Sequence, residues 1–107
     1  MISEEDVEMA VTYLRSSAEG AAKARAERVY IEEARKSVLA TIMKKYADMP
    51  VNAQEREAMA DPEYKNHLDA IREAVYADEK YRLMRAAAEA RIDAWRSLNA
   101  NYRAIKV

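Results

Sequence analysis

Residues 61–102 read DPEYKNHLDAIREAVYADEKYRLMRAAAEARIDAWRSLNANY, with no Gly and no Pro after Pro62. The stretch opens with a helix-start signal, because an Asp caps free backbone N–H groups and Pro suits the first helical position. Glu63 adds an acid to the first turn, which the helix dipole favours. Apolar residues then recur at spacings of three and four. The stretch therefore predicts one long helix over residues 62–104.

The first half of the chain carries a second long helical pattern. Ser3 predicts a helix cap, and apolar residues with helical spacing continue over residues 4–47. Gly20 is the one weak position inside this helix and the place where it can bend. Pro50 disfavours helix at the residue before it, so the helix ends near residue 48. Asn52 followed by Glu55 predicts a short helix over residues 53–59.

Composition limits the fold to one all-helical domain. The chain has 107 residues, one Gly, two Pro and no Cys, while helix-forming residues dominate. Two helices of similar length with a short connection predict an all-α fold, a long antiparallel helical hairpin with a short helix or loop at the turn. No apolar run is long enough for a membrane span, and the acidic N-terminus is unlike a secretory signal. We therefore expect a cytoplasmic protein, in the host cell cytoplasm if a phage encodes it.

The charges form four blocks of alternating sign. Residues 1–20, 21–47, 48–79 and 80–107 carry net charges of −4, +4, −6 and +5. An antiparallel hairpin places opposite blocks side by side, so these charges can set the pairing of the two helices. Residues 21–30 and 80–89 are both basic, however, and meet in the middle of such a hairpin. We expect their charges to stay uncompensated there.

Rows of arginine on helix flanks suit a phosphate backbone, because guanidinium binds phosphate through two hydrogen bonds. The candidate nucleic-acid-binding residues are Arg25, Arg28, Arg35, Lys36, Lys44, Lys45, Lys80, Arg82 and Arg85. Aromatic residues could stack on bases. Those on or beside the apolar stripes favour packing instead, and they are Tyr46, Tyr64, Trp95 and Tyr102. The roles of Tyr13, Tyr30, Tyr76 and Tyr81 stay open.

The sequence offers little for catalysis. Without Cys there is no thiolate nucleophile or thiolate zinc site, and a single Gly excludes a glycine-rich phosphate loop. The single histidine, His67, is expected on the helix surface, without the repeated Glu-x-x-His motifs of helical di-iron sites. We expect no enzyme, no cofactor and no metal site.

Two segments of the second half resemble a known family. Ala77-Asp78-Glu79-Lys80 and the later segment Ala94–Ala104 are similar to the C-terminal part of phage recombination mediators of the UvsY type, and residues 33–38 are similar to that family's central helix. The resemblance runs from residue 29 onward, about two thirds of the chain. It implies a protein that binds single-stranded DNA and helps to load a RecA-like recombinase onto strands coated by single-strand-binding protein. Thr41-Ile42-Met43 stands where the family has a basic step, with Lys44 and Lys45 just beyond.

The last helix is also expected to join subunits. The resemblance implies an oligomer assembled through the C-terminal helix, and the apolar spacing independently favours a homo-oligomer. The residues expected at this interface are Ala94, Trp95, Leu98, Tyr102 and Ile105. The alternative is a small helical structural or adaptor protein that assembles with other proteins and has no nucleic-acid role.

Overall fold

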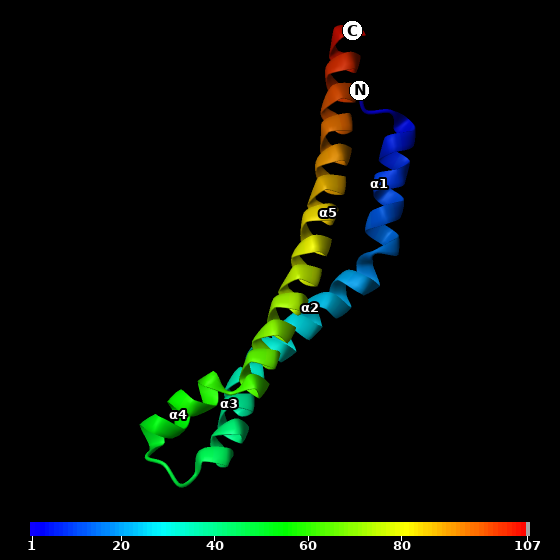
Figure 1. Cartoon of the computed structure of the whole chain (residues 1–107). Helices are drawn as coiled ribbons and strands as arrows, with labels where there is room; N and C mark the ends of the chain where they lie inside the picture. Colours follow the sequence, from blue (N-terminus) through cyan, green and yellow to red (C-terminus); the bar gives the residue numbers. More distant parts are fainter. Residues whose placement is uncertain (107) are drawn as a thin grey trace. The chain divides into compact units, whose positions relative to one another are not determined.

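The computed structural model describes residues 1–106, and these residues form an all-α fold, as predicted (Figure 1). The helices are α1 (Glu4–Ser16), α2 (Ala18–Glu33), α3 (Arg35–Met43), the 3₁₀ turn η1 (Lys44–Tyr46), α4 (Val51–Ala60) and α5 (Pro62–Lys106). The chain divides into a terminal unit, residues 1–23 with the residues from 79 onward, and a central unit, residues 24–78. Helices α2 and α5 contribute to both.

Helix α1 begins with the predicted cap. The backbone N–H of Asp6 donates to the Ser3 hydroxyl at 3.1 Å, and the backbone N–H of Ser3 donates to the Asp6 carboxylate at 2.9 Å. This reciprocal pair satisfies two N–H groups that the first helical turn leaves without partners.

The helix predicted over residues 4–47 is interrupted at Ser17 and Ala34. The hydrogen-bond ladder nevertheless continues through both places, because the N–H of Ser17 donates to the Tyr13 carbonyl and the N–H of Ala34 to the Tyr30 carbonyl, each at 2.9 Å. The interruptions are therefore bends in a continuous ladder. Gly20, the expected bend, lies inside α2.

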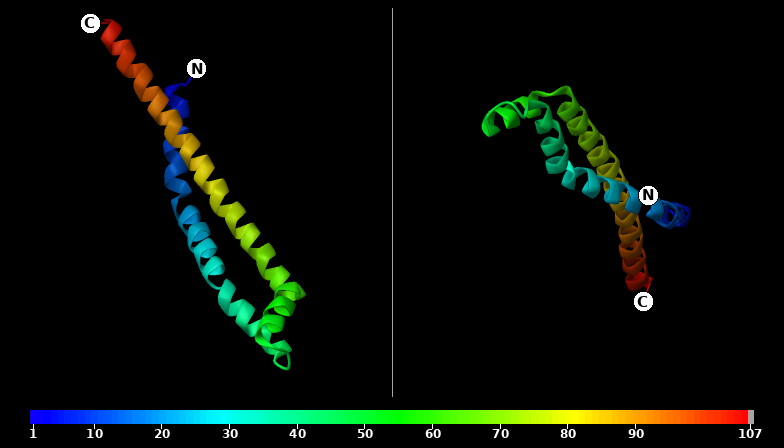
Figure 2. Two further views of the ribbon diagram at one scale, coloured as in Figure 1. Left: turned by 90° about the vertical axis from the view of Figure 1, so that its left-hand side faces the viewer. Right: turned by 90° about the horizontal axis from the view of Figure 1, so that it is seen from below.

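In the terminal unit, α1 runs antiparallel to the last part of α5 (Figure 2). Ala10 of α1 and Ala88 of α5 are both buried. Gly20 has a packing role here, since a Cβ at this position would lie 2.9 Å from Cζ of Tyr81 and closer still to its hydroxyl. The small residues Ala10 and Gly20, on the N-terminal helices of this unit, thus let α5 approach closely.

In the central unit, the core lies where the chain turns. Ile42, Ala58 and Tyr64 form a buried cluster. Partly buried apolar residues pack around this cluster, and they are Val38, Leu39, Met43 and Tyr46. Helix α4 packs against α3 and thereby closes the turn. It is the short helix that the sequence predicts at the turn.

Asp61 joins the core of the central unit to the start of α5. Its carboxylate accepts the Glu63 backbone N–H at 2.9 Å, the Tyr46 hydroxyl at 2.8 Å and the Lys45 ammonium at 3.4 Å. These hydrogen bonds, led by that from Glu63, lower the pKa of the Asp61 carboxyl. The cap predicted from the sequence thus also ties α5 to η1.

Candidate interaction surfaces

Arg25 and Arg28, two of the predicted DNA-binding residues, share one carboxylate in the central unit. Asp78 accepts from Arg28 Nη1 at 3.0 Å and from Arg25 Nη1 at 3.4 Å, and its own side chain is only 9% exposed. Arg28 also binds Glu32 at 3.0 Å. The expectation that these arginines stay uncompensated was wrong, because the buried Asp78 faces them from α5. Arg25 keeps much of its side chain exposed.

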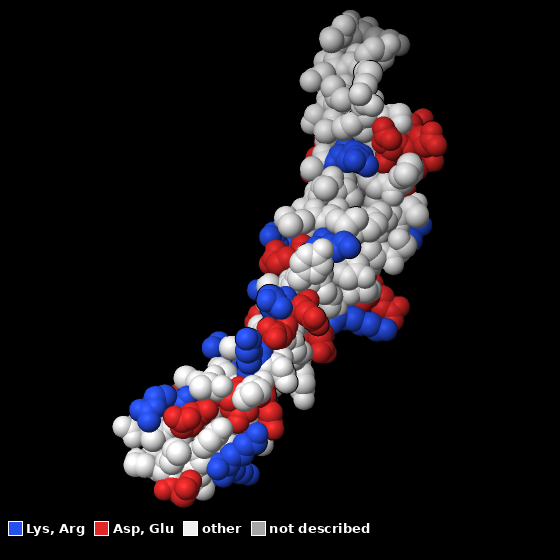
Figure 3. Space-filling model, in the orientation of Figure 1, with Lys and Arg blue, Asp and Glu red and all other residues white. Residues whose placement is uncertain are grey.

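Two further candidates support the turn of the central unit. Arg35 Nε donates to the Tyr64 hydroxyl at 2.9 Å. Lys45 binds Glu63 at 2.6 Å and Asp61 at 3.4 Å, and the hydrogen bond to Glu63 is the main reason why the pKa of Lys45 is raised. Both cations are therefore held by groups of the fold, and Figure 3 shows acidic and basic atoms intermixed over α3, α4 and the start of α5.

The candidates on α5 in the terminal unit differ from one another. Arg82 pairs with Glu79, three residues earlier, at 2.6 Å on an exposed surface. Arg85 is half-buried, and its Nη1 donates to the Leu14 carbonyl and to the Ser17 hydroxyl, both at 2.7 Å. Arg85 thus closes the C-terminal end of α1, and the structure assigns it a role in packing.

The three remaining candidates are Lys36, Lys44 and Lys80. All three are exposed, and no ion pair holds them within residues 1–106. Lys36 and Lys44 belong to the central unit, on α3 and η1 respectively. They are the predicted cations best placed to bind a phosphate without breaking a contact of the fold.

The predicted oligomer interface is an apolar stripe at the end of α5. Leu98, Tyr102 and Ile105 are 47%, 59% and 83% exposed, while Ala94 and Trp95 are half-buried. A hollow of about 440 Å³ lies over this stripe, and its lining includes Met1, Ile2, Trp95, Leu98, Tyr102 and Ile105. Most of the apolar surface of this segment therefore faces outward.

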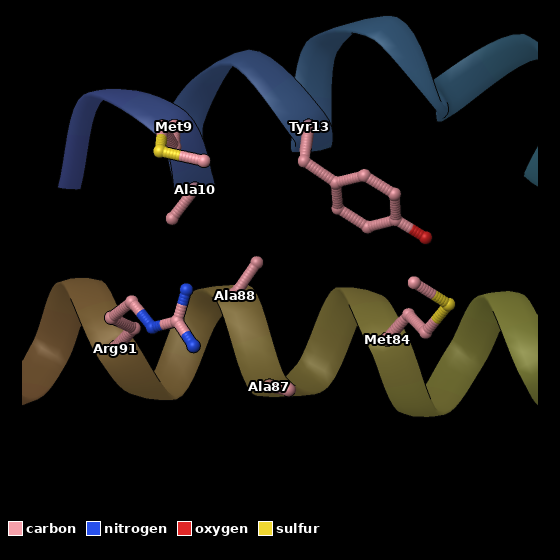
Figure 4. A pocket seen from close by; sticks show the side chains of 7 residues that line it. All are labelled: Met9, Ala10, Tyr13, Met84, Ala87, Ala88 and Arg91. Carbon is pink, nitrogen blue, oxygen red and sulfur yellow. The ribbon is translucent and has the colours of Figure 1, made fainter. Parts of the chain in front are cut away.

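A second hollow, of about 270 Å³, lies between α1 and α5 (Figure 4). Figure 4 shows Met9 and Tyr13 reaching down from α1, and Met84 and Arg91 rising from α5. The sequence analysis did not identify Met9 as a residue of this surface. Its spacing of four from Tyr13, which places both on one face of α1, was the available signal.

His67 differs from its expected surface position. It is half-buried, and its Nε2 atom is buried without a hydrogen-bond partner among the described residues. No group of three or more His, Cys, Asp or Glu residues that could hold a metal occurs in the described part of the chain. Helices that combine enough length and apolar character to cross a membrane are likewise absent from residues 1–106.

No protein-family model, curated protein or solved structure matches the chain.

Proposed function

We propose that the chain is a self-assembling accessory protein of DNA recombination, a mediator that binds single-stranded DNA across several copies and helps to load a RecA-like recombinase. The observation that carries the proposal is the exposed apolar stripe of α5. Burying a side chain such as Leu98 or Ile105 contributes about 1.5–3 kcal/mol. Contiguous apolar surface of this kind typically marks an interface, and a second copy of the chain is its proposed partner.

Assembly matters for DNA binding because the predicted DNA-binding set leaves only a few cations available in a single copy. Lys36, Lys44 and Lys80 are exposed without ion pairs in the described residues, and Arg25 is partly available. A few phosphate contacts give weak affinity, but several linked copies along one strand multiply it. Tyr30 and Tyr76 are 70% and 68% exposed and suit base stacking. From the resemblance to recombination mediators, the expected protein partners are the recombinase and the single-strand-binding protein.

The test is the binding of a fluorescent oligothymidine at 50 and 200 mM NaCl, with the mass in solution measured in parallel. Each phosphate contact should add about 0.7 to the slope of log affinity against log salt. Replacing Lys36, Lys44 and Lys80 by Gln should weaken binding and reduce that slope while the mass stays the same. The matched control replaces Lys23, Arg56 and Arg72 by Gln, since each of them pairs with a neighbouring acid.

A helical adaptor or assembly protein without a nucleic-acid role is the second candidate. It is favoured by the contacts of Arg25, Arg28, Arg35, Lys45, Arg82 and Arg85, which all bind groups of the chain itself. It predicts an oligomer with no measurable affinity for oligothymidine at 50 mM NaCl. That result would reject the mediator and leave the assembly part of the proposal standing.

A further inference from the structure

The two ends of the chain carry opposite charges. The sequence has four acidic residues and no Lys or Arg before Arg15, and it has three basic residues and no acidic residue after Asp93. Both segments belong to the terminal unit. In the described residues, however, no ion pair joins Glu4, Glu5 or Glu8 to an arginine of α5. The charges of these three glutamates therefore have no ion-pair partner among the described residues, whereas Asp6 interacts electrostatically with Arg91.

The reason lies in the direction of the acidic side chains. Ala10 is buried, so this side of α1 is the packed side of the helix. At about 100° per residue, Glu5 and Glu8 lie roughly 140–160° around the helix from Ala10. They point away from the packed side, and Figure 3 shows acidic atoms on the surface at the start of α1. The packing of α1 against α5 in the terminal unit thus leaves Glu5 and Glu8 on the outer surface.

These acids line a groove on the exposed side of α1. A hollow of about 490 Å³ is lined by Glu5, Glu8, Met9, Thr12, Tyr13 and Ser16. Met9 is 63% exposed, and together with Tyr13 it also lines the hollow of Figure 4. The groove therefore combines the adaptable apolar side chains of Met9 and Tyr13 with the negative charges of Glu5 and Glu8.

The end of α5 carries the complementary chemistry. Trp95-Arg96 and Tyr102-Arg103 are two aromatic–arginine steps placed seven residues apart. Seven residues are close to two helical turns, so both steps lie along one line of α5. Arg96 forms an ion pair with Asp93 at 3.8 Å on the surface, and Tyr102 is largely exposed. This line presents aromatic rings and guanidinium groups side by side.

We propose that residues 95–105 of one copy dock into the α1 groove of a second copy, with Arg96 and Arg103 facing Glu5 and Glu8. The inference rests on the proposed self-assembly and names the surface that the C-terminal stripe meets. Two C-terminal segments docked on each other would bring like charges together, which disfavours a tail-to-tail contact. The contact is therefore tail to groove, either reciprocal in a two-fold dimer or repeated from copy to copy into a ring or a filament.

The test uses two charge-reversed proteins, a groove variant (Glu5→Arg with Glu8→Arg) and a tail variant (Arg96→Glu with Arg103→Glu). Each alone should dissociate, with the apparent dissociation constant of assembly raised at least tenfold in low salt. Mixed in equal amounts they should reassemble, because each groove then meets an oppositely charged tail. A chain with all four changes should also assemble. Matched controls reverse Glu55 with Glu73, or Arg56 with Arg72, in the central unit.

Mass in solution across a dilution series is the readout, and circular dichroism verifies that every variant is folded. A tail variant that keeps the wild-type mass overturns the inference, as does a mixture of folded variants that stays dissociated. A tail variant that keeps its mass but loses oligothymidine binding assigns the aromatic–arginine steps to DNA and also overturns it. A monomeric wild type rejects both the inference and the proposed assembly, whereas an oligomeric wild type with insensitive variants rejects the inference alone.

Discussion

Arg85 reaches across the terminal unit and donates to the Ser17 hydroxyl at 2.7 Å. The same guanidinium nitrogen donates to the Leu14 carbonyl, also at 2.7 Å. The chain bends at Ser17, between α1 and α2, so this guanidinium binds both a carbonyl of the last turn of α1 and the side chain at the bend. Arg85 therefore acts as a cap supplied from another helix.

Replacing Arg85 by Gln should destabilise the protein by about 1.5–3 kcal/mol, because hydrogen bonds from a charged group are lost at a buried serine. The effect should appear in thermal unfolding followed by circular dichroism. Arg82→Gln is the matched control, since the exposed pair of Arg82 and Glu79 should contribute less than about 1 kcal/mol. Equal stability losses in the two variants would contradict the capping role.

Asp61 should make stability depend on pH in the acid range. Its carboxyl has a pKa below the ordinary value of 3.8, mainly because the Glu63 N–H and the Tyr46 hydroxyl donate to the charged form. The unfolded chain then binds the proton more tightly than the folded chain, so the contribution of Asp61 is present above about pH 4. It is lost as the pH falls through the lower, folded pKa.

Asp61→Asn should therefore lower the Tm by several degrees at pH 7 and flatten its decrease between about pH 5 and pH 2. The comparison protein is Asp48→Asn, because Asp48 is exposed and its side chain has no ion pair in the described residues. Parallel pH curves for Asp61→Asn and the wild type would show that this carboxylate does not carry the acid sensitivity.

Helix α5 could be predicted from the sequence because its signals are local. Asp61 and Pro62 mark its start, and the absence of Gly and further Pro lets it continue, so the predicted range 62–104 agrees closely with Pro62–Lys106. The bends at Ser17 and Ala34 could not be predicted in this way. Ser and Ala are both compatible with a helix, and the side-chain contact at Ser17 comes from Arg85, far away in the sequence.

The individual ion pairs depend on how the paired helices are aligned with each other, residue by residue. The sequence does not specify this alignment. Block charges indicate which segments attract each other, and an antiparallel pairing follows. Whether Arg28 meets a carboxylate of α5 depends on where Asp78 lies along that helix, and a shift of one residue would turn the Asp78 side chain by about 100°. The same limit applies to Lys36 and Lys44, whose lack of ion pairs is a property of the folded chain.

His67 offers a site where a substitution should stabilise the protein. Its Nε2 atom is buried without a hydrogen-bond partner, and such an atom costs about 1–3 kcal/mol. His67→Phe replaces the imidazole by an aromatic ring without polar atoms, so we expect a free energy of unfolding, measured in urea, that is higher by about 1 kcal/mol. Asn66→Ala, at the exposed neighbouring position, should change it little. A clear loss of stability in His67→Phe would mean that Nε2 has a polar partner in solution.

Gly20 and Tyr81 should behave as a coupled pair. Ala is favoured over Gly in a helix by about 1 kcal/mol, so Gly20→Ala would stabilise an open helix. Here the new Cβ would lie 2.9 Å from Cζ of Tyr81 and would displace its ring, so we expect a net loss of stability. In a Tyr81→Leu background the obstacle is gone, and Gly20→Ala should then stabilise the protein by up to about 1 kcal/mol. Thermal unfolding of the four proteins of this double-mutant cycle measures the coupling. If Gly20→Ala has the same effect in both backgrounds, the ring of Tyr81 does not pack on Gly20.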